Sequence, residues 1–113
     1  MDLTAAVYSA TSNFPKQEMF GLTSQMRRAS VSIASNIAEG HGRATDRHFA
    51  LFVSQARGSL FELETQIQIS ANLHYISPGQ KDWLMSQSAE LGRIINGLLR
   101  TLRDERKKSA AFP

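Results

Sequence analysis

The sequence of 113 residues contains no cysteine, which excludes a disulfide framework and any thiolate metal site. It has only 3 prolines and 7 glycines, too few for a loop-rich or disordered chain. No run approaches the roughly 20 apolar residues of a membrane span, and the first residues lack the basic and apolar stretches of a signal peptide. We therefore expect one cytoplasmic domain that does not engage a membrane.

Two segments in the first third of the chain have the apolar spacing that is typical of amphipathic helices. The first covers about residues 2–13 and ends before Pro15, because the residue before a proline avoids helical angles. The second covers about residues 22–39. Gly40 follows it, where a glycine in the left-handed conformation commonly ends a helix.

Two longer segments follow, and each begins with a capping signal. The third covers about residues 46–75, and Thr45 is expected to cap its first turn. The fourth covers about residues 78–107. Ser77 and Gln80 have the spacing of a capping box, with a proline at the first helical position.

Within each longer segment the apolar residues recur every three or four positions and so form one buried face. The expected core is Leu22, Met26, Ala29, Ile33, Ile37, Phe49, Val53, Ala56, Leu60, Leu63, Ile67, Ala71, Leu84, Leu91, Ile94, Ile95, Leu98 and Leu102. Short connections favour antiparallel neighbours. The sequence thus predicts an all-α, up-down antiparallel four-helix bundle with a long hairpin of its last two helices. The domain would cover residues 1–108, with a frayed tail at 109–113.

A second apolar stripe lies on the other side of the third predicted helix, at Leu51, Gly58, Ile69 and Leu73. A helix with apolar residues on two opposed faces is packed on both sides. Glycine inside a helix costs about 1 kcal/mol relative to alanine, so close approach of another chain would explain Gly58. We expect a homo-oligomer contact here, and scattered surface apolar residues are the alternative.

The sequence lacks the residue patterns of a catalytic bundle. No glutamate is followed three residues later by a histidine, as di-iron bundles require. His41, His48 and His74 match no zinc spacing and are interpreted as solvated. Gly40-His41-Gly42 follows a helix and not a strand, which favours a turn over a phosphate loop. No serine has a neighbouring base. We expect no enzyme activity, metal or cofactor.

Polar residues punctuate the second and third predicted helices and the turn between them. They are Asn36, Glu39, Arg43, Arg57, Glu62 and Glu64. A buried polar group must be hydrogen-bonded, or its burial is costly. The first four residues of this set are expected to form one network that ties the turn to the bundle. A ligand pocket is the alternative.

Positive charge is concentrated in the last predicted helix. Residues 93–108 hold six cations and two anions, whereas the whole chain has a net charge of +3. The cations are Arg93, Arg100, Arg103, Arg106, Lys107 and Lys108. Such a row attracts nucleic-acid phosphates. A solvated helix face, an acidic protein partner and an anionic membrane are the alternatives. No aromatic residue lies between these cations, so binding would depend on the phosphate backbone and the shape of the nucleic acid more than on its bases.

Three sequence blocks carry a family resemblance. They are FPKQEMFGLTSQMRRA at residues 14–29, SIASNIAEGHGR at residues 32–43 and ARGSLFELE at residues 56–64. Together they resemble the four-helix-bundle family of ribosomal RNA intervening-sequence proteins, which includes the accessory variability protein of diversity-generating retroelements. The resemblance covers about residues 3–103. Members usually begin with additional residues, often including a tryptophan, that lengthen the first helix.

The resemblance implies a ring-like homopentamer without known enzymatic activity. Some members are encoded within large-subunit ribosomal RNA genes, and the retroelement relatives bind a reverse transcriptase and nucleic acid. The positions that match the family motif are Asn36, Glu39, Gly40, Arg43, Arg57, Gly58, Glu62 and Glu64. We therefore expect a homopentamer that binds structured RNA, or duplex RNA or DNA, through the last helix. An adapter for an acidic or reverse-transcriptase-like partner protein is the alternative.

Overall fold

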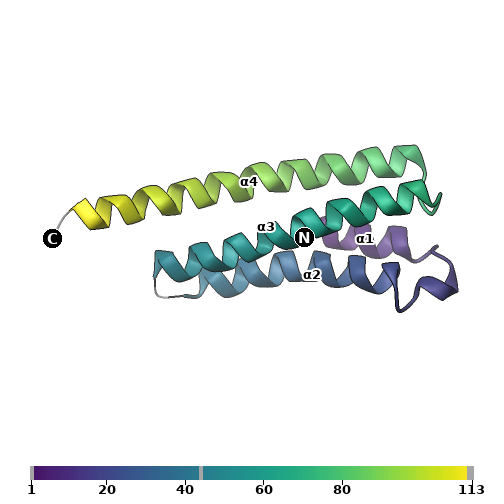
Figure 1. The fold of residues 1–113 in the computed structure, drawn as a ribbon, viewed down its shortest axis with the longest axis horizontal. Helices are drawn as coiled ribbons and strands as arrows, with labels where there is room; N and C mark the ends of the chain where they lie inside the picture. The colour runs from purple at the N-terminus through teal and green to yellow at the C-terminus, as the bar shows by residue number, and fades with distance from the viewer. Residues whose placement is uncertain (1, 44, 112–113) are drawn as a thin grey trace.

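The computed structural model of the chain describes residues 2–43 and 45–111. Its elements are α1 (Asp2–Thr11), the short 3-10 helix η1 (Lys16–Glu18), α2 (Leu22–His41), α3 (Asp46–Asn72) and α4 (Pro78–Ala111). Consecutive helices run in opposite directions in a rod of 58 × 23 × 18 Å (Figure 1), and the described residues form no strand. The predicted all-α antiparallel bundle, with a long α3–α4 hairpin, is confirmed.

α1 is short, with 10 residues against 34 in α4, and lies along only one part of the rod (Figure 1). It packs against α2 and α4 and buries Leu3 and Val7. The Thr4 hydroxyl donates to the backbone oxygen of Ser30 at 3.4 Å. This contact places the N-terminal end of α1 beside Ser30 of α2. Among the described residues, the rest of the rod is therefore built from α2, α3 and α4, with no fourth helix beside them.

The core follows the predicted apolar faces with one exception. The predicted residues of α2 and α3 are buried or partly buried, and Leu84, Ile95 and Leu102 are buried in α4. Ile94 was expected in the core but is 59% exposed. It lies three helical turns beyond Trp83, which lines the contact with α1, so both share one flank of α4. The described part of α1 ends before this level, and Ile94 stays uncovered.

The predicted caps form as expected. The backbone N–H of His48 donates to Thr45 Oγ1 at 3.2 Å at the start of α3. At the start of α4, the N–H of Ser77 donates to Gln80 Oε1 at 2.8 Å. The N–H of Gln80 donates to Ser77 Oγ at 3.1 Å in return. This reciprocal pair is a capping box, which satisfies two backbone donors and directs the chain into α4.

Gly40 is not the expected left-handed cap. It lies inside α2, which continues to His41, and it is buried. A Cβ atom at Gly40 would lie 2.7 Å from Phe52 Cβ and 2.9 Å from Phe49 Cδ1. The glycine therefore lets α2 and α3 approach closely beside their turn. Gly42 follows as the cap residue, with a φ of −83°.

α3 ends at Asn72, three residues earlier than predicted, because His74 takes a left-handed φ of 61°. The N–H of Tyr75 then donates to the Ser70 carbonyl at 2.9 Å. The N–H of His74 donates to the Ala71 carbonyl at 3.0 Å. This is the bonding pattern of a Schellman motif, which stops the helix and starts the turn to α4.

α4 also ends later than predicted, since it continues to Ala111 instead of stopping near residue 107. Part of the expected frayed tail, residues 109–111, is therefore helical, and residues 112–113 lie outside the described chain.

Among the described residues, none of the helices combines the length and apolar character that crossing a bilayer requires.

The turn between α1 and α2 is tied to the turn between α3 and α4. The Tyr75 hydroxyl donates to Glu18 Oε2 at 2.9 Å, and this hydrogen bond raises the pKa of the Tyr75 phenol. The other Glu18 oxygen accepts from the Leu22 N–H at 3.3 Å, and the Phe14 and Tyr75 rings lie 5.2 Å apart. One carboxylate thus joins three elements at this end of the rod.

Candidate nucleic-acid interface and subunit contact

The six predicted cations of α4 are all exposed. Arg93 forms an ion pair with Glu90, and Lys108 Nζ lies 3.9 Å from Glu105 Oε1. Within the described chain, no ion pair or side-chain hydrogen bond engages the other four, which are Arg100, Arg103, Arg106 and Lys107. These four side chains can bind a polyanion without first breaking an ion pair or a side-chain hydrogen bond within the described chain.

The C-terminal end of α4 projects beyond the hydrophobic core. Leu102 is the last buried side chain among those described, and residues 103–108 are all charged and exposed. Figure 1 shows this part of α4 extending beyond the turn that joins α2 to α3. Charged groups on a projecting helix remain well solvated and are open to a large ligand from several sides.

Sequence reasoning missed Arg47, because it treated the last helix alone. Arg47 lies in the first turn of α3, yet it lines the same hollow of about 710 Å³ as Arg106 of α4. The two residues are far apart in the sequence, and only the antiparallel packing of α3 and α4 brings them to one place. The basic surface therefore extends beyond α4 onto α3.

The second apolar stripe of α3 is exposed. Leu51, Ile69 and Leu73 are 55%, 42% and 48% exposed, and a Cβ added at Gly58 would have no neighbouring atom within 4 Å. Phe61, which is 57% exposed, extends this surface because it follows Gly58 by three residues. We call these five residues the apolar α3 face. Its position supports a subunit contact, although the described chain alone leaves it solvated.

The polar residues near the α2–α3 turn form separate pairs instead of the expected single network. Asn36 Nδ2 donates to the Ser32 carbonyl at 2.9 Å, and Ser32 Oγ lies 2.9 Å from Ser59 Oγ. The Ser32–Ser59 contact joins α2 to α3, whereas the Asn36 hydrogen bond lies within α2. Arg43 and Glu39 form their own exposed ion pair at 2.6 Å on α2 and the following turn.

The remaining motif residues of α3 do not share one set of contacts. Arg57 Nη1 donates to Asn96 Oδ1 at 3.2 Å and so joins α3 to α4. Glu62 is exposed, whereas partial burial raises the pKa of the Glu64 carboxyl above its ordinary value. Since that folded-state pKa exceeds the unfolded one, the favourable contribution of Glu64 to stability is greatest at acidic pH. It is lost as the pH rises through the folded pKa.

The histidines do not gather into a site. His41, His48 and His74 are exposed, and they lie at the end of α2, in the first turn of α3 and in the turn that follows α3. In the part of the chain that the structure describes, no three His, Asp or Glu side chains lie close enough together to hold a metal ion. The α4 cations with Arg47 and the apolar α3 face are two candidate surfaces for a partner that do not involve the histidines.

Comparison with known proteins adds a family to this geometry. A solved protein of unknown function from the S23 ribosomal protein family of Bacteroides thetaiotaomicron has the same fold, with a TM-score of 0.78 and 20% sequence identity. The alignment covers 87% of this chain and 92% of that one. No curated protein matches the chain. The family model of the 23S rRNA-intervening sequence protein matches residues 1–97, and the chain therefore belongs to that family.

Proposed function

We propose that this protein is a non-enzymatic, cytoplasmic homo-oligomer that binds structured RNA or other nucleic acid through the cations of α4. The observation that carries the proposal is the row of exposed cations on a helix end that projects from the bundle. Arg100, Arg103 and Lys107 lie on neighbouring turns, so they form a line that can follow a phosphate backbone. Release of counterions from the phosphates would supply much of the affinity.

The apolar α3 face supports the oligomer in this proposal. An exposed Leu, Phe and Ile around a glycine form a surface on which another helix can pack closely. The family resemblance implies a pentameric ring, and we adopt that order as part of the proposal. A ring of identical chains would repeat the basic row and multiply its contacts with one long polyanion.

The decisive experiment is a salt titration of RNA binding. A fluorescently labelled RNA hairpin is titrated with wild-type protein and with the triple variant Arg100→Ser, Arg103→Ser, Lys107→Ser at several KCl concentrations. We expect the wild-type log–log plot to fall steeply. The variant slope should be shallower by about one for each phosphate that a removed cation neutralises in the wild type.

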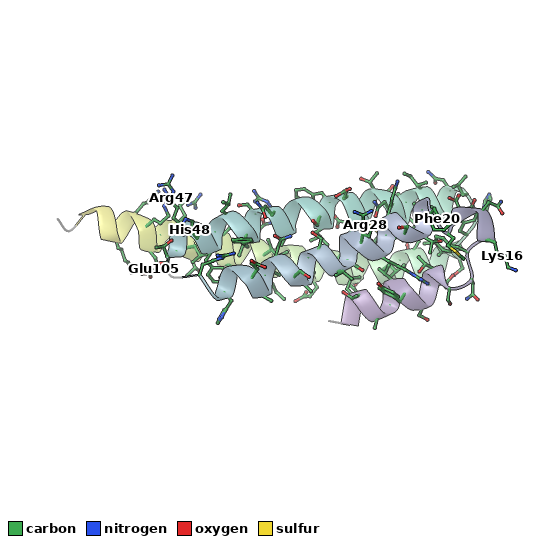
Figure 2. All side chains as sticks on the ribbon, turned by 90° about the horizontal axis from the view of Figure 1, so that it is seen from below. Lys16, Phe20, Arg28, Arg47, His48 and Glu105 are labelled. Carbon is green, nitrogen blue, oxygen red and sulfur yellow. The ribbon has the colours of Figure 1, made fainter. Side chains whose placement is uncertain are left out.

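A second triple variant provides the matched control for charge. Lys16→Ser, Arg28→Ser and Lys81→Ser remove the same number of cations from other parts of the rod (Figure 2 labels Lys16 and Arg28). This variant should keep the wild-type slope. A wild-type plot without salt dependence, or equal slopes for the two triple variants, would reject α4 as the nucleic-acid interface.

A protein-binding adapter is the second candidate function. Phe20 is 93% exposed and lies at the η1 end of the rod, opposite the basic end (Figure 2). Met19, which precedes it and directly follows η1, is 57% exposed. Exposed apolar side chains of this size favour contact with another protein. Co-purification of one defined protein, in a preparation without nucleic-acid absorbance, would favour this function over RNA binding.

A further inference from the structure

The start of α3 and the end of α4 border a hollow that is open to solvent, which we call the α3–α4 cleft. Its volume is about 710 Å³, and its charged walls are Arg47 on α3 and Arg106 on α4. Ser54 adds a hydroxyl group, and Ala50 and Leu51 add an apolar wall. The cleft thus combines cations, a neutral donor and apolar surface contributed by two helices.

Both arginines of the α3–α4 cleft lack a counterion within the described residues, since neither forms an ion pair or a side-chain hydrogen bond there. Glu105, which precedes Arg106 in the sequence, has its Oε1 3.9 Å from Lys108 Nζ. Two guanidinium groups on one hollow repel each other unless an anion lies between them. The composition of the cleft is therefore suited to an anionic ligand.

We propose that the α3–α4 cleft holds the sugar–phosphate backbone of a nucleic-acid strand, with Arg47 and Arg106 donating to phosphate oxygens. This inference rests on the proposed function and adds α3 to the binding surface. The planar guanidinium group can donate two parallel hydrogen bonds to one phosphate. Ser54 supplies a further donor, and Ala50 offers an apolar surface for the sugar.

The lining of the cleft indicates which part of a nucleic acid it would contact. Among residues 2–43 and 45–111, no phenylalanine, tyrosine or tryptophan lines it, so these walls offer no aromatic stacking platform for bases. His48 is the aromatic ring among the described lining residues, and its Nδ1 lies 3.1 Å from Thr45 Oγ1. Contacts in the cleft would therefore position the backbone without selecting a base sequence.

A nucleic acid fits the surroundings of the cleft better than an acidic protein does. The cleft continues the row of cations along α4, in which Arg93 and Lys107 are separated by roughly 20 Å at 1.5 Å per residue. A polymer with an anion at every repeat can engage this whole line and the cleft at once. A short acidic peptide would engage it only where its own carboxylates coincide with the cations.

The test compares Arg47→Ser with Arg28→Ser, which removes the same charge from α2. Arg28 is also exposed and forms no ion pair among the described residues, and it lies toward the opposite half of the rod (Figure 2). Affinity for a labelled RNA hairpin is measured against KCl concentration. Arg47→Ser should lower the log–log slope by about 1, as Arg106→Ser should, while Arg28→Ser leaves it unchanged.

The outcomes separate this inference from the proposed function. A steep wild-type slope with equal slopes for Arg47→Ser and Arg28→Ser would overturn the cleft site but leave α4 as an interface. A flat wild-type slope would overturn both. Unlabelled poly-glutamate of matched charge serves as a competitor. If it displaced the RNA as effectively as unlabelled RNA does, the cleft would be a site for acidic protein instead. Circular dichroism would show that each variant keeps the wild-type helix content.

Discussion

Two glycines in helices have opposite surroundings. Gly40 is enclosed by Phe49 and Phe52, whereas Gly58 faces open space. Glycine weakens a helix interior by about 1 kcal/mol relative to alanine, and both positions incur that cost. At Gly40 the cost is offset by the close packing of α2 on α3. At Gly58 nothing within the described chain offsets it, and the proposed subunit contact would supply the missing close packing.

Alanine at each glycine should therefore have opposite effects on the stability of the fold. Gly40→Ala should lower the free energy of unfolding by about 1–3 kcal/mol, because its Cβ would overlap Phe52 Cβ. In the dissociated chain, where a Cβ at Gly58 meets no neighbouring atom, Gly58→Ala should raise it by about 0.5–1 kcal/mol through helix propensity. Chemical denaturation of both variants at a protein concentration low enough to keep the chain dissociated measures the difference. A Gly40→Ala variant as stable as Gly58→Ala would contradict the packing role.

The role of Gly40 illustrates what the sequence could not provide at this scale. A glycine after an apolar helical segment is typical of a cap, and the sequence alone favoured that interpretation. The two phenylalanines that require a missing side chain lie on the next helix. Their proximity depends on how the two helices cross, which residue spacing does not specify. For the same reason, the sequence did not predict that Arg47 lies beside Arg106.

Helix length and helix ends follow different physical rules in this chain. Apolar spacing and local caps predicted four helices, the capping box at Ser77 and the Thr45 cap, because these signals act within a few residues. Ile94 was placed wrongly, because its burial depends on how far α1 reaches along a partner helix. The end of α3 was placed wrongly because backbone bonds from Tyr75 and His74 close the helix without a glycine.

His74 provides a test of that helix end. Its φ of 61° is a left-handed conformation, which costs a residue with a Cβ about 1–2 kcal/mol and glycine little. His74→Gly should therefore raise the free energy of unfolding by about 1 kcal/mol. His74→Ala keeps the strained backbone and serves as the control, with no comparable gain expected. Thermal melts of the two variants distinguish them, and equal melting temperatures would show that the turn is not strained.

At the scale of the molecule, the apolar α3 face and the basic surface lie on the same hairpin. Leu51 belongs to the apolar α3 face and also lines the α3–α4 cleft. A neighbouring copy that packs on this face would therefore stand next to the cleft. Assembly would then determine how closely the basic surfaces of adjacent chains are spaced, and so how a long polyanion binds several of them together.

Assembly through the apolar α3 face can be tested at Gly58. Gly58→Leu adds a bulky side chain that the open surroundings in one chain accommodate, so helix content should stay unchanged. Close packing of a second copy should be prevented, and light scattering should report a smaller mass than wild type. Ser35→Leu adds a leucine to the exposed surface of α2 and should keep the wild-type mass. A wild-type protein that is monomeric at every concentration, or a Gly58→Leu variant of unchanged mass, would show that this face does not join subunits.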